Sequence, residues 1–392
     1  MSGTVLYLAP YPPIRSGIAD YARAYKAAVE ACTSWRLTVA DCGPRPAGNA
    51  PPRLPAAYRR AKALRSEGRL GAVDLVHAEI GVKQHDEFWT LFWLRRLAPD
   101  TRYCVTVHDP PLVMAPALYP LALGLRAAGV RRALRVLDYT PAGRMVVRSV
   151  LGRAGGVFAL SDAGRESVRG LVSGSARLTT LPFLAYGGSR VGERERAGTG
   201  PPRVLFLGFW GPGRGLEVLL DAVEEALRRR PGALRLTLAG GVEEGGANRG
   251  YVERLRARVR RSPARDAIEE AGYVPAEQLD GVFAGADIFV LPSTCTGWLS
   301  TSSVLFRAMG AGLAIVASDV GVVSEEIRHR RTGLLVPPGD AAALAEALLL
   351  LADDRDLRAR LGREARAHLE AEHDETRVAE AAARTYEAVS RT

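Results

Sequence analysis

The feature that most constrains the fold is an alternation of short apolar strands with amphipathic helices, which runs through the chain in two series. The first series opens at residues 4–9 and the second at residues 203–208. Residues 187–202 lie between them and contain almost no side chain that could enter a core, which is typical of a linker. Parallel strands need a long crossover, so such alternation favours parallel sheets covered by helices. We therefore predict an α/β fold with two domains.

The composition is that of a soluble globular protein, with 47% hydrophobic and 24% charged residues. No apolar run reaches the ~20 residues of a membrane span, and residues 1–10 lack the pattern of a secretion signal. The four cysteines show neither metal-type nor redox-type spacing. A reduced, cytoplasmic location is expected.

Positive charge is concentrated in the first half of the chain. Up to residue 195 there are 27 basic and 15 acidic residues, against 26 and 28 in the remainder. A basic surface favours an anionic partner such as a phosphorylated substrate or a membrane face, although a solvated arginine-rich surface is an equally simple interpretation. Nucleic acid is least favoured, because no nucleic-acid-binding signature is present. The arginines that we expect at a membrane are Arg126, Arg131, Arg132, Arg135, Arg144 and Arg148.

Residues 299–318 combine a run of small hydroxyl residues, a short apolar helix, a glycine stop and a buried-type strand. Thr301, Ser302 and Ser303 stand where the helix begins. A helix start presents free N–H groups and the positive end of a dipole, which is where α/β proteins bind phosphates. An ordinary strand–helix crossover with a serine-rich cap is the alternative.

Three further strand ends carry candidate ligand-binding residues. Residues 207–216 read Leu-Gly-Phe-Trp-Gly-Pro-Gly-Arg-Gly-Leu, so glycines and Arg214 lie between a strand and a helix. An arginine there can hold two phosphate oxygens. Ser16 and Gly17 form a similar but simpler turn in the first half. His108 closes a buried strand and points toward the crevice where α/β proteins bind ligands, unless it is a purely structural histidine.

Several segments, in this order along the chain, resemble one family. They are residues 11–21, 106–109, 207–215, 272–277, 291–293, 308–312 and 333–339. Together they resemble the retaining, nucleotide-sugar-dependent glycosyltransferases of the GT-B fold, a family that includes sucrose synthases and bacterial mannosyl- and glucosyltransferases.

The resemblance implies two Rossmann-like parallel-sheet domains that face a central cleft. Residues 1–190 would bind the acceptor, residues 191–202 would be the linker, residues 203–375 would bind the nucleotide sugar, and residues 376–392 would be a helix returning to the first domain. It also implies a bacterial, metal-independent enzyme without cofactor that transfers a sugar from a nucleotide-diphosphate sugar to an acceptor hydroxyl with retained anomeric configuration. The acceptor would be a small molecule or a lipid-linked one, with peripheral contact at the inner membrane face.

The resemblance also implies site residues. His108 is the catalytic candidate, and Asp109 and Glu79 are the acceptor-binding candidates. The donor-binding candidates are Ser16, Gly17, Gly208, Phe209, Arg214, Gly215, Tyr273, Val274, Thr296, Thr301, Ser302, Ser303 and Arg307.

Three of these residues depart from the family pattern. Phe209 stands where the family usually has arginine, and Thr296 and Arg307 fall where it usually has two glutamates. These departures leave open the nucleotide, the sugar and the acceptor. They also leave two alternatives, which are a non-catalytic GT-B protein that binds a nucleotide or glycan, and another GT-B enzyme such as a nucleotide-sugar epimerase or a phosphorylase.

Overall fold

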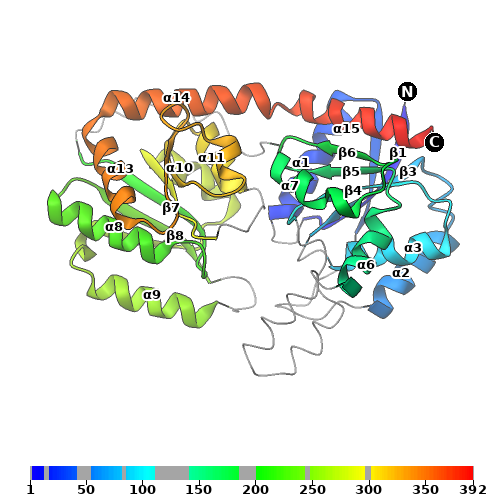
Figure 1. Ribbon diagram of the computed structural model, residues 1–392, viewed down its shortest axis with the longest axis horizontal. Coiled ribbons are helices and arrows are strands. Elements are labelled where there is room, and N and C mark those ends of the chain that lie inside the picture. Colours follow the sequence, from blue (N-terminus) through cyan, green and yellow to red (C-terminus); the bar gives the residue numbers. More distant parts are fainter. Residues whose placement is uncertain are drawn as a thin grey trace. The chain divides into compact units, whose positions relative to one another are not determined.

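A computed structural model describes residues 2–12, 17–41, 54–81, 85–110, 141–184, 200–242, 248–295 and 302–391 (Figure 1). These residues form two compact units. The first unit contains the described residues up to Leu184 and those from His373 onward, and the second contains those from Gly200 to Glu372. Each is an α/β unit with its own parallel sheet and core, so the predicted fold class is confirmed.

The first unit is built on a six-stranded parallel sheet in the order β2-β1-β3-β4-β5-β6. Its strands are β1 (Gly3–Ala9), β2 (Trp35–Asp41), β3 (Leu75–Ile80), β4 (Tyr103–Val107), β5 (Gly156–Ala159) and β6 (Arg177–Thr180). Its helices are α1 (Gly17–Cys32), α2 (Leu54–Ser66), α3 (His85–Leu97), α6 (Pro141–Leu151), α7 (Asp162–Val168) with the 3-10 turn η2 (Arg169–Leu171), and α15 (Glu375–Ser390).

The second unit has the strand order β12-β11-β10-β7-β8-β9, again all parallel. Its strands are β7 (Arg203–Phe209), β8 (Arg235–Gly241), β9 (Ile268–Gly272), β10 (Ile288–Leu291), β11 (Ala314–Ser318) and β12 (Leu334–Val336). Its helices are α8 (Leu216–Arg229), α9 (Arg249–Arg261), α10 (Leu279–Ala284), α11 (Ser303–Gly310), α12 (Val323–Glu326), α13 (Ala341–Asp353) and α14 (Arg355–Glu372), with 3-10 turns η3 (Arg265–Ala267) and η4 (Ala276–Gln278).

Both sheets have a topological switch point. In the first unit β1 lies between β2 and β3, so the chain leaves β1 toward one side and later returns to the other. In the second unit β7 lies in the same way between β8 and β10. The loops that follow the two strands at a switch point diverge, which leaves a crevice at the carboxyl ends of the strands. The candidate ligand sites should therefore lie at the ends of β1 and β3 and of β7 and β10.

The cores follow from the patterns that predicted the elements. All residues of β3 and β4 are buried, as expected for central strands of a parallel sheet covered on both faces. In α8 the buried residues Leu216, Leu219, Leu220 and Val223 recur every three or four positions and pack on the sheet. Among the helices of the described part of the chain, none is long and apolar enough to cross a bilayer.

Most element bounds agree with the prediction to within a few residues, but one strand is shifted and two short elements were not predicted. The third strand begins at Leu75 and continues to Ile80, whereas we predict residues 72–77. The carboxylate of Asp74 accepts a hydrogen bond from the Thr4 backbone N–H at 2.7 Å, so Asp74 precedes the strand. The strand β6 was not predicted, because it offers only one apolar residue, Leu178. The short helix α12 was not predicted either.

Some predictions concern residues outside the described ranges. They include most of a loop that we predict at residues 43–56, and a helix that we predict at residues 116–136 with four of the arginines expected at a membrane. They also include nearly all of the linker at 187–202. Three predicted donor-binding residues also lie outside, namely Ser16, Thr296 and Thr301.

Candidate active site

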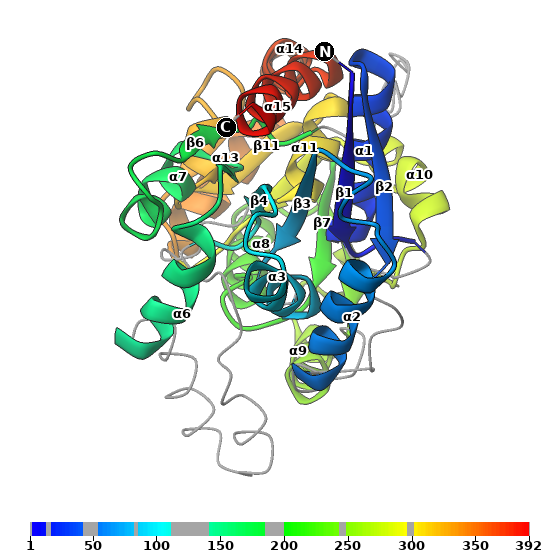
Figure 2. The same ribbon diagram turned by 90° about the vertical axis from the view of Figure 1, so that its right-hand side faces the viewer.

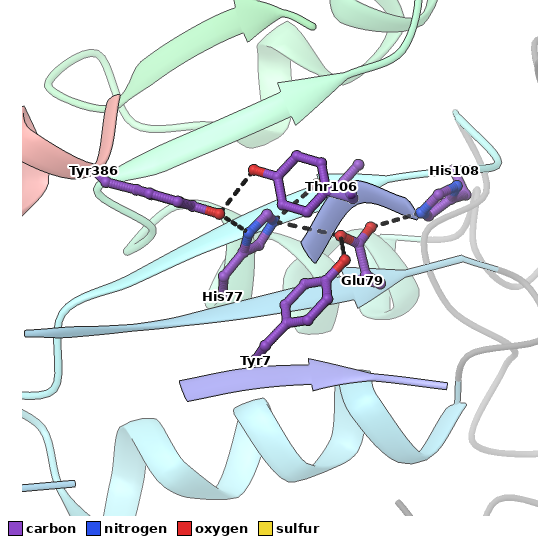
Figure 3. A network of polar contacts seen from close by, with 7 residues as sticks. Tyr7, His77, Glu79, Thr106, His108 and Tyr386 are labelled. Atoms are coloured by element: carbon purple, nitrogen blue, oxygen red, sulfur yellow. Dashed lines mark hydrogen bonds and ion pairs between the residues drawn. The ribbon is translucent and has the colours of Figure 1, made fainter. Parts of the chain in front are cut away.

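A network of buried polar side chains lies at the carboxyl half of the first sheet (Figure 3). His77 and Glu79 are two positions apart on β3, so they point to the same face of the sheet. In the parallel register Tyr7 of β1 stands beside His77, and Thr106 of β4 stands beside Glu79. His108 comes two positions after Thr106 and extends this row of polar side chains beyond the end of β4.

Glu79 is the centre of this network. Its carboxylate is fully buried, and both oxygens are engaged: Oε1 accepts from the Tyr7 hydroxyl at 2.5 Å, and Oε2 lies 2.6 Å from His108 Nε2. Burial alone would raise the pKa of Glu79, but the hydrogen bond from His108, the charges of both histidines and the Tyr7 hydroxyl lower it overall. The side chain is therefore a carboxylate at neutral pH.

His108 is the member of the network closest to solvent, with 7% of its surface exposed. A carboxylate can only accept, so His108 donates to Glu79 from Nε2. The other ring nitrogen, Nδ1, has no hydrogen-bond partner among the described residues. The edge-to-face contact with the Tyr21 ring, at 5.1 Å between centroids, fixes the imidazole further. A histidine held in this way presents Nδ1 to a ligand.

Sequence reasoning did not assign His77 and Tyr386 to the site. The His77 ring is fully buried and its Nδ1 lies 2.5 Å from the hydroxyl of Tyr386, which belongs to α15. Its Nε2 lies 2.8 Å from Thr106 Oγ1. Burial lowers the pKa of His77 to about 4 against the opposing charge of Glu79, so this ring is neutral at pH 7. The signal in the sequence was the alternation His-x-Glu and Thr-x-His in two otherwise apolar strands.

The second candidate region is the glycine-rich loop after β7. The last two residues of β7 are Gly208, which is half-buried, and Phe209, which is 42% exposed. Further along, the Arg214 backbone N–H donates to the Gly211 carbonyl at 3.1 Å and closes a turn. Gly215 has φ +74°, and a Cβ there would lie 1.6 Å from the Pro292 carbonyl oxygen. Only glycine fits this position, so the loop can lie directly against the chain that follows β10.

The loops after β7 and β10 are also joined by hydrogen bonds. The Gly213 carbonyl oxygen accepts from the Thr294 backbone N–H at 3.0 Å and from the Ser293 hydroxyl at 3.2 Å. These are the two loops at the switch point of the second sheet. The backbone thus holds the predicted phosphate loop in place without using its one cationic side chain.

Anion-binding groups at this edge are open. The Arg214 side chain is exposed, and it makes no hydrogen bond or ion pair within the part of the chain that the structure describes. The helix α8 begins after Gly215, which offers no capping side chain, and α11 begins after Ser302, whose hydroxyl makes no capping bond. The first N–H groups of both helices therefore lack a side-chain acceptor. Ser302 and Ser303 were predicted at this helix start and are found there.

The remaining predicted residues lie near these two regions or at the same strand ends. Tyr273 is exposed and Val274 half-buried directly after β9, on the carboxyl edge of the second sheet. Arg307 is half-buried in the last turn of α11, away from the start of that helix. In the first unit, Gly17 begins α1 and Asp109 follows His108 half-buried.

The two sheets with their switch-point sites define a class, the two-domain Rossmann-like proteins of the GT-B fold. The sucrose-phosphate synthase of Thermosynechococcus elongatus has this fold and superposes with a TM-score of 0.69, covering 98% of each chain at 19% identity. Residues 201–354 match the family described as glycosyl transferases group 1. This match and the shared fold confirm the predicted resemblance.

Two relatives are similar over a larger part of the chain. A D-inositol 3-phosphate glycosyltransferase of Nocardia farcinica is 29% identical over 316 residues, which cover 79% of this chain and 65% of the relative. A GDP-mannose-dependent α-(1-6)-phosphatidylinositol monomannoside mannosyltransferase of Mycobacterium tuberculosis is 28% identical over 283 residues, which cover 67% of this chain and 71% of the relative. The match thus spans just under two thirds of the length of the Nocardia relative.

Proposed function

We propose that this protein is a glycosyltransferase that moves a sugar from a nucleotide-diphosphate sugar to an acceptor hydroxyl, with retention of anomeric configuration and without a metal ion or cofactor. One observation carries the proposal. The domain that matches the glycosyl transferases group 1 family presents an exposed arginine and two helix starts without side-chain caps at the switch point of its sheet. Such an arrangement suits a diphosphate, because it combines a cation with free N–H groups.

The diphosphate of the donor would bind to Arg214 and to the N–H groups of Ser302 and Ser303, with the loop of residues 208–215 beside it. Without a metal ion, the charge that develops on the leaving diphosphate has to be stabilised by fixed donors. Phe209 brings no charge, so Arg214 is the main cation of this loop. Further donor contacts are proposed for Gly17, Tyr273, Val274 and Arg307, and for Ser16, Thr296 and Thr301 outside the described ranges.

His108 would contact the reacting sugar or its acceptor through Nδ1. With Nε2–H bonded to Glu79, a neutral His108 accepts a hydrogen bond from a substrate hydroxyl at Nδ1. Glu79 is predicted to bind the acceptor, but its carboxylate is fully buried with both oxygens engaged. We therefore assign it to the orientation of His108, as for groups that hold a functional histidine in place. Asp109 remains the proposed acceptor contact.

The proposed acceptor is an anionic, phosphate-bearing polyol. The names of both relatives describe an inositol that carries a phosphate, free in one case and within a lipid in the other. The excess of basic residues in the first half of the chain agrees with such an acceptor. It would bind to the first unit, and we expect this reaction in the cytoplasm.

A lipid-linked acceptor would bring the first unit to a membrane surface, and one face of that unit suits such a contact. Helix α6 exposes Arg144, Arg148 and Met145, whose surface is 72% accessible. Helix α6 lies beside α3, and α3 packs in turn on α2. Figure 2 shows these three helices in a row. On α3 the Arg96 guanidinium lies 3.6 Å from the centre of the Phe92 ring. Arginines beside aromatic and apolar side chains are typical of interfacial surfaces.

The membrane contact is tested by co-sedimentation with vesicles. Each arginine near an anionic leaflet contributes about 1 kcal/mol. We expect the Arg144→Glu/Arg148→Glu double variant to bind anionic vesicles at least tenfold more weakly at low salt. Arg235→Glu, an exposed arginine of the second unit, is the control and should bind like the wild type. Equal wild-type binding to anionic and neutral vesicles would favour a soluble acceptor.

The transfer itself is tested with a panel of nucleotide sugars and inositol-based acceptors in the presence of EDTA. NMR of the product reads the anomeric configuration, and retention is the expected result. Loss of transfer in Arg214→Ala, with normal transfer in Arg235→Ala, would support the donor site. Inverted product or dependence on a divalent cation would contradict the mechanism. Nucleotide binding without turnover would favour a non-catalytic protein. The departures from the family pattern at Phe209, Thr296 and Arg307 are the observation that supports this alternative.

A further inference from the structure

The last helix of the chain contributes a buried side chain to the network around Glu79. Tyr386 of α15 is fully buried, and its hydroxyl lies 2.5 Å from His77 Nδ1 and 2.7 Å from the hydroxyl of Tyr25 on α1 (Figure 3). The hydroxyl therefore has two partners and sits at one end of the row that leads through His77 and Glu79 to His108.

The direction of the hydrogen bonds around His77 follows from the charge of Glu79. The edge of the ring that carries Nε2 lies 2.8 Å from Thr106 Oγ1 and 3.8 Å from Glu79 Oε1. A neutral imidazole carries one proton. If that proton were on Nδ1, the lone pair of Nε2 would face the carboxylate, which is unfavourable in a buried site. With the proton on Nε2, the ring donates to Thr106 and presents a positive edge to Glu79.

This choice assigns a role to Tyr386. If Nε2 is protonated, Nδ1 is an acceptor, so the Tyr386 hydroxyl has to donate to it and the Tyr25 hydroxyl has to donate to Tyr386. Burial raises the pKa values of both tyrosines well above the ordinary value, which keeps both hydroxyls protonated. The hydrogen bonds then run in one direction, from Tyr25 through Tyr386 and His77 to Thr106.

We propose that Tyr386 is a positioning residue for the reaction, which holds His77 in the Nε2–H tautomer so that His77 stabilises the Glu79 carboxylate beneath His108. The ring of Tyr386 is fixed independently of its hydroxyl, by edge-to-face contacts with Trp35 at 5.3 Å and with His77 at 5.6 Å between centroids. Removal of the hydroxyl alone therefore leaves the packing in place. The last helix, α15, thus contributes to the network that positions His108.

The tautomer is tested by NMR of protein labelled with ¹⁵N-histidine. The chain has six histidines, and His77→Gln identifies the signals of His77. In the wild type at pH 7 we expect the Nε2–H tautomer, and in Tyr386→Phe a shift toward the Nδ1–H tautomer or a mixture. Tyr103→Phe is the matched control, because it also removes one buried hydroxyl of the same unit, which bonds to the Val150 carbonyl outside the network. It should leave the His77 signals unchanged.

The effect on the reaction rests on the proposed function and is measured separately. We expect Tyr386→Phe to lower kcat about three- to tenfold with the donor KM within twofold, while Tyr103→Phe changes neither. Tyr25→Phe, which removes only the donor to Tyr386, should act in the same direction but more weakly. If Tyr386→Phe lowers only the melting temperature, as Tyr103→Phe does, Tyr386 is structural and the proposal fails.

Failure of the proposed function would look different. If the wild type transfers no sugar from any donor, the proposed function is contradicted, and the NMR experiment still decides the role of Tyr386 toward His77. A wild-type His77 in the Nδ1–H tautomer, or His77 signals that Tyr386→Phe leaves unchanged, would overturn the proposal whether or not the protein is active.

Discussion

The carboxyl edges of the two sheets differ in how their polar and charged side chains are paired. In the first unit the polar side chains are buried and bonded to one another, with Glu79 engaged by Tyr7 and His108 and with His77 engaged by Thr106 and Tyr386. In the second unit the cation Arg214 is exposed, and the loop is held through its backbone, to which the side chains of Ser293 and Asn248 donate hydrogen bonds.

The difference shows what each edge requires before a ligand arrives. A buried carboxylate has to be paired and hydrogen-bonded, because an unpaired buried charge is very costly. The network of the first unit is therefore complete in the free protein and its geometry is set in advance. A site for a diphosphate has to leave its cation and N–H groups open, because the ligand supplies the opposite charge. We expect substitutions in the first unit to change the reaction and the stability, and those in the second to change ligand affinity.

The largest effect is expected from His108→Gln. The side-chain amide of the introduced glutamine can still donate to Glu79, but the imidazole and its free Nδ1 are lost. We predict that kcat falls about 100-fold or more, since removal of one preorganised polar contact to a transition state typically costs about 2.7–4 kcal/mol. Steady-state kinetics with the identified donor would measure this. A loss of less than tenfold would mean that His108 does not contact the reacting atoms.

Glu79→Ala should be the most destabilising of the single substitutions in the network. It leaves the Tyr7 hydroxyl and the His108 N–H without an acceptor, and each buried unsatisfied group costs about 1–3 kcal/mol. We predict a loss of about 3 kcal/mol or more in the free energy of unfolding, measured with urea. Glu253→Ala, at an exposed position of α9, should change it by no more than about 0.5 kcal/mol. Equal effects of the two variants would contradict the described network.

The stability of the first unit should depend on pH through His77. Its pKa is about 4 in the folded protein and 6.5 ordinarily, so between these values the unfolded chain binds more protons. The free energy of unfolding should therefore fall as the pH drops from 6.5 toward 4, by up to about 3 kcal/mol. Glu79, whose pKa is lowered, adds a further loss below about pH 4.5.

Urea titrations at pH 7, 6 and 5 test this dependence. The wild type should lose stability across the series, and His77→Gln should lose clearly less, because it removes the buried base. A wild-type stability that is constant from pH 7 to pH 5 would show that His77 is charged in the folded protein or accessible to water.

A smaller effect, confined to the second unit, is expected at Arg330. Among the described residues, it is the non-glycine residue with positive φ, at 62°, a conformation that costs most side chains about 1–2 kcal/mol. Arg330→Gly should stabilise the second unit by about 0.5–1 kcal/mol, because the greater entropy of unfolded glycine offsets part of the gain. The neighbouring Arg331→Gly should destabilise it. Calorimetric unfolding at pH 7 measures both, and a loss of stability in Arg330→Gly would contradict this backbone geometry.

The sequence predicted the site at the carboxyl edge of the second sheet better than the buried network at that of the first. The strand ends, the glycine loop and Arg214 could be read locally, because a phosphate loop is a short segment with characteristic residues. The close approach of Gly215 to Pro292 could not, since it depends on which strands become neighbours. In the first unit His108 and Glu79 were singled out separately, but not as a pair. Tyr386 was missed, because it lies 309 positions from His77 and no local pattern joins them.

The central claim is that nucleotide affinity depends on the second unit and not on the network of the first. It is tested most directly by calorimetric titration of UDP and GDP into the wild type, Arg214→Ala and His108→Gln. We predict that Arg214→Ala weakens binding of the preferred nucleotide by about 1.5–3 kcal/mol, the range for a hydrogen bond to a charged group, or roughly 10- to 150-fold. His108→Gln should bind this nucleotide like the wild type. Unchanged affinity in Arg214→Ala, or an equal loss in His108→Gln, would contradict the account.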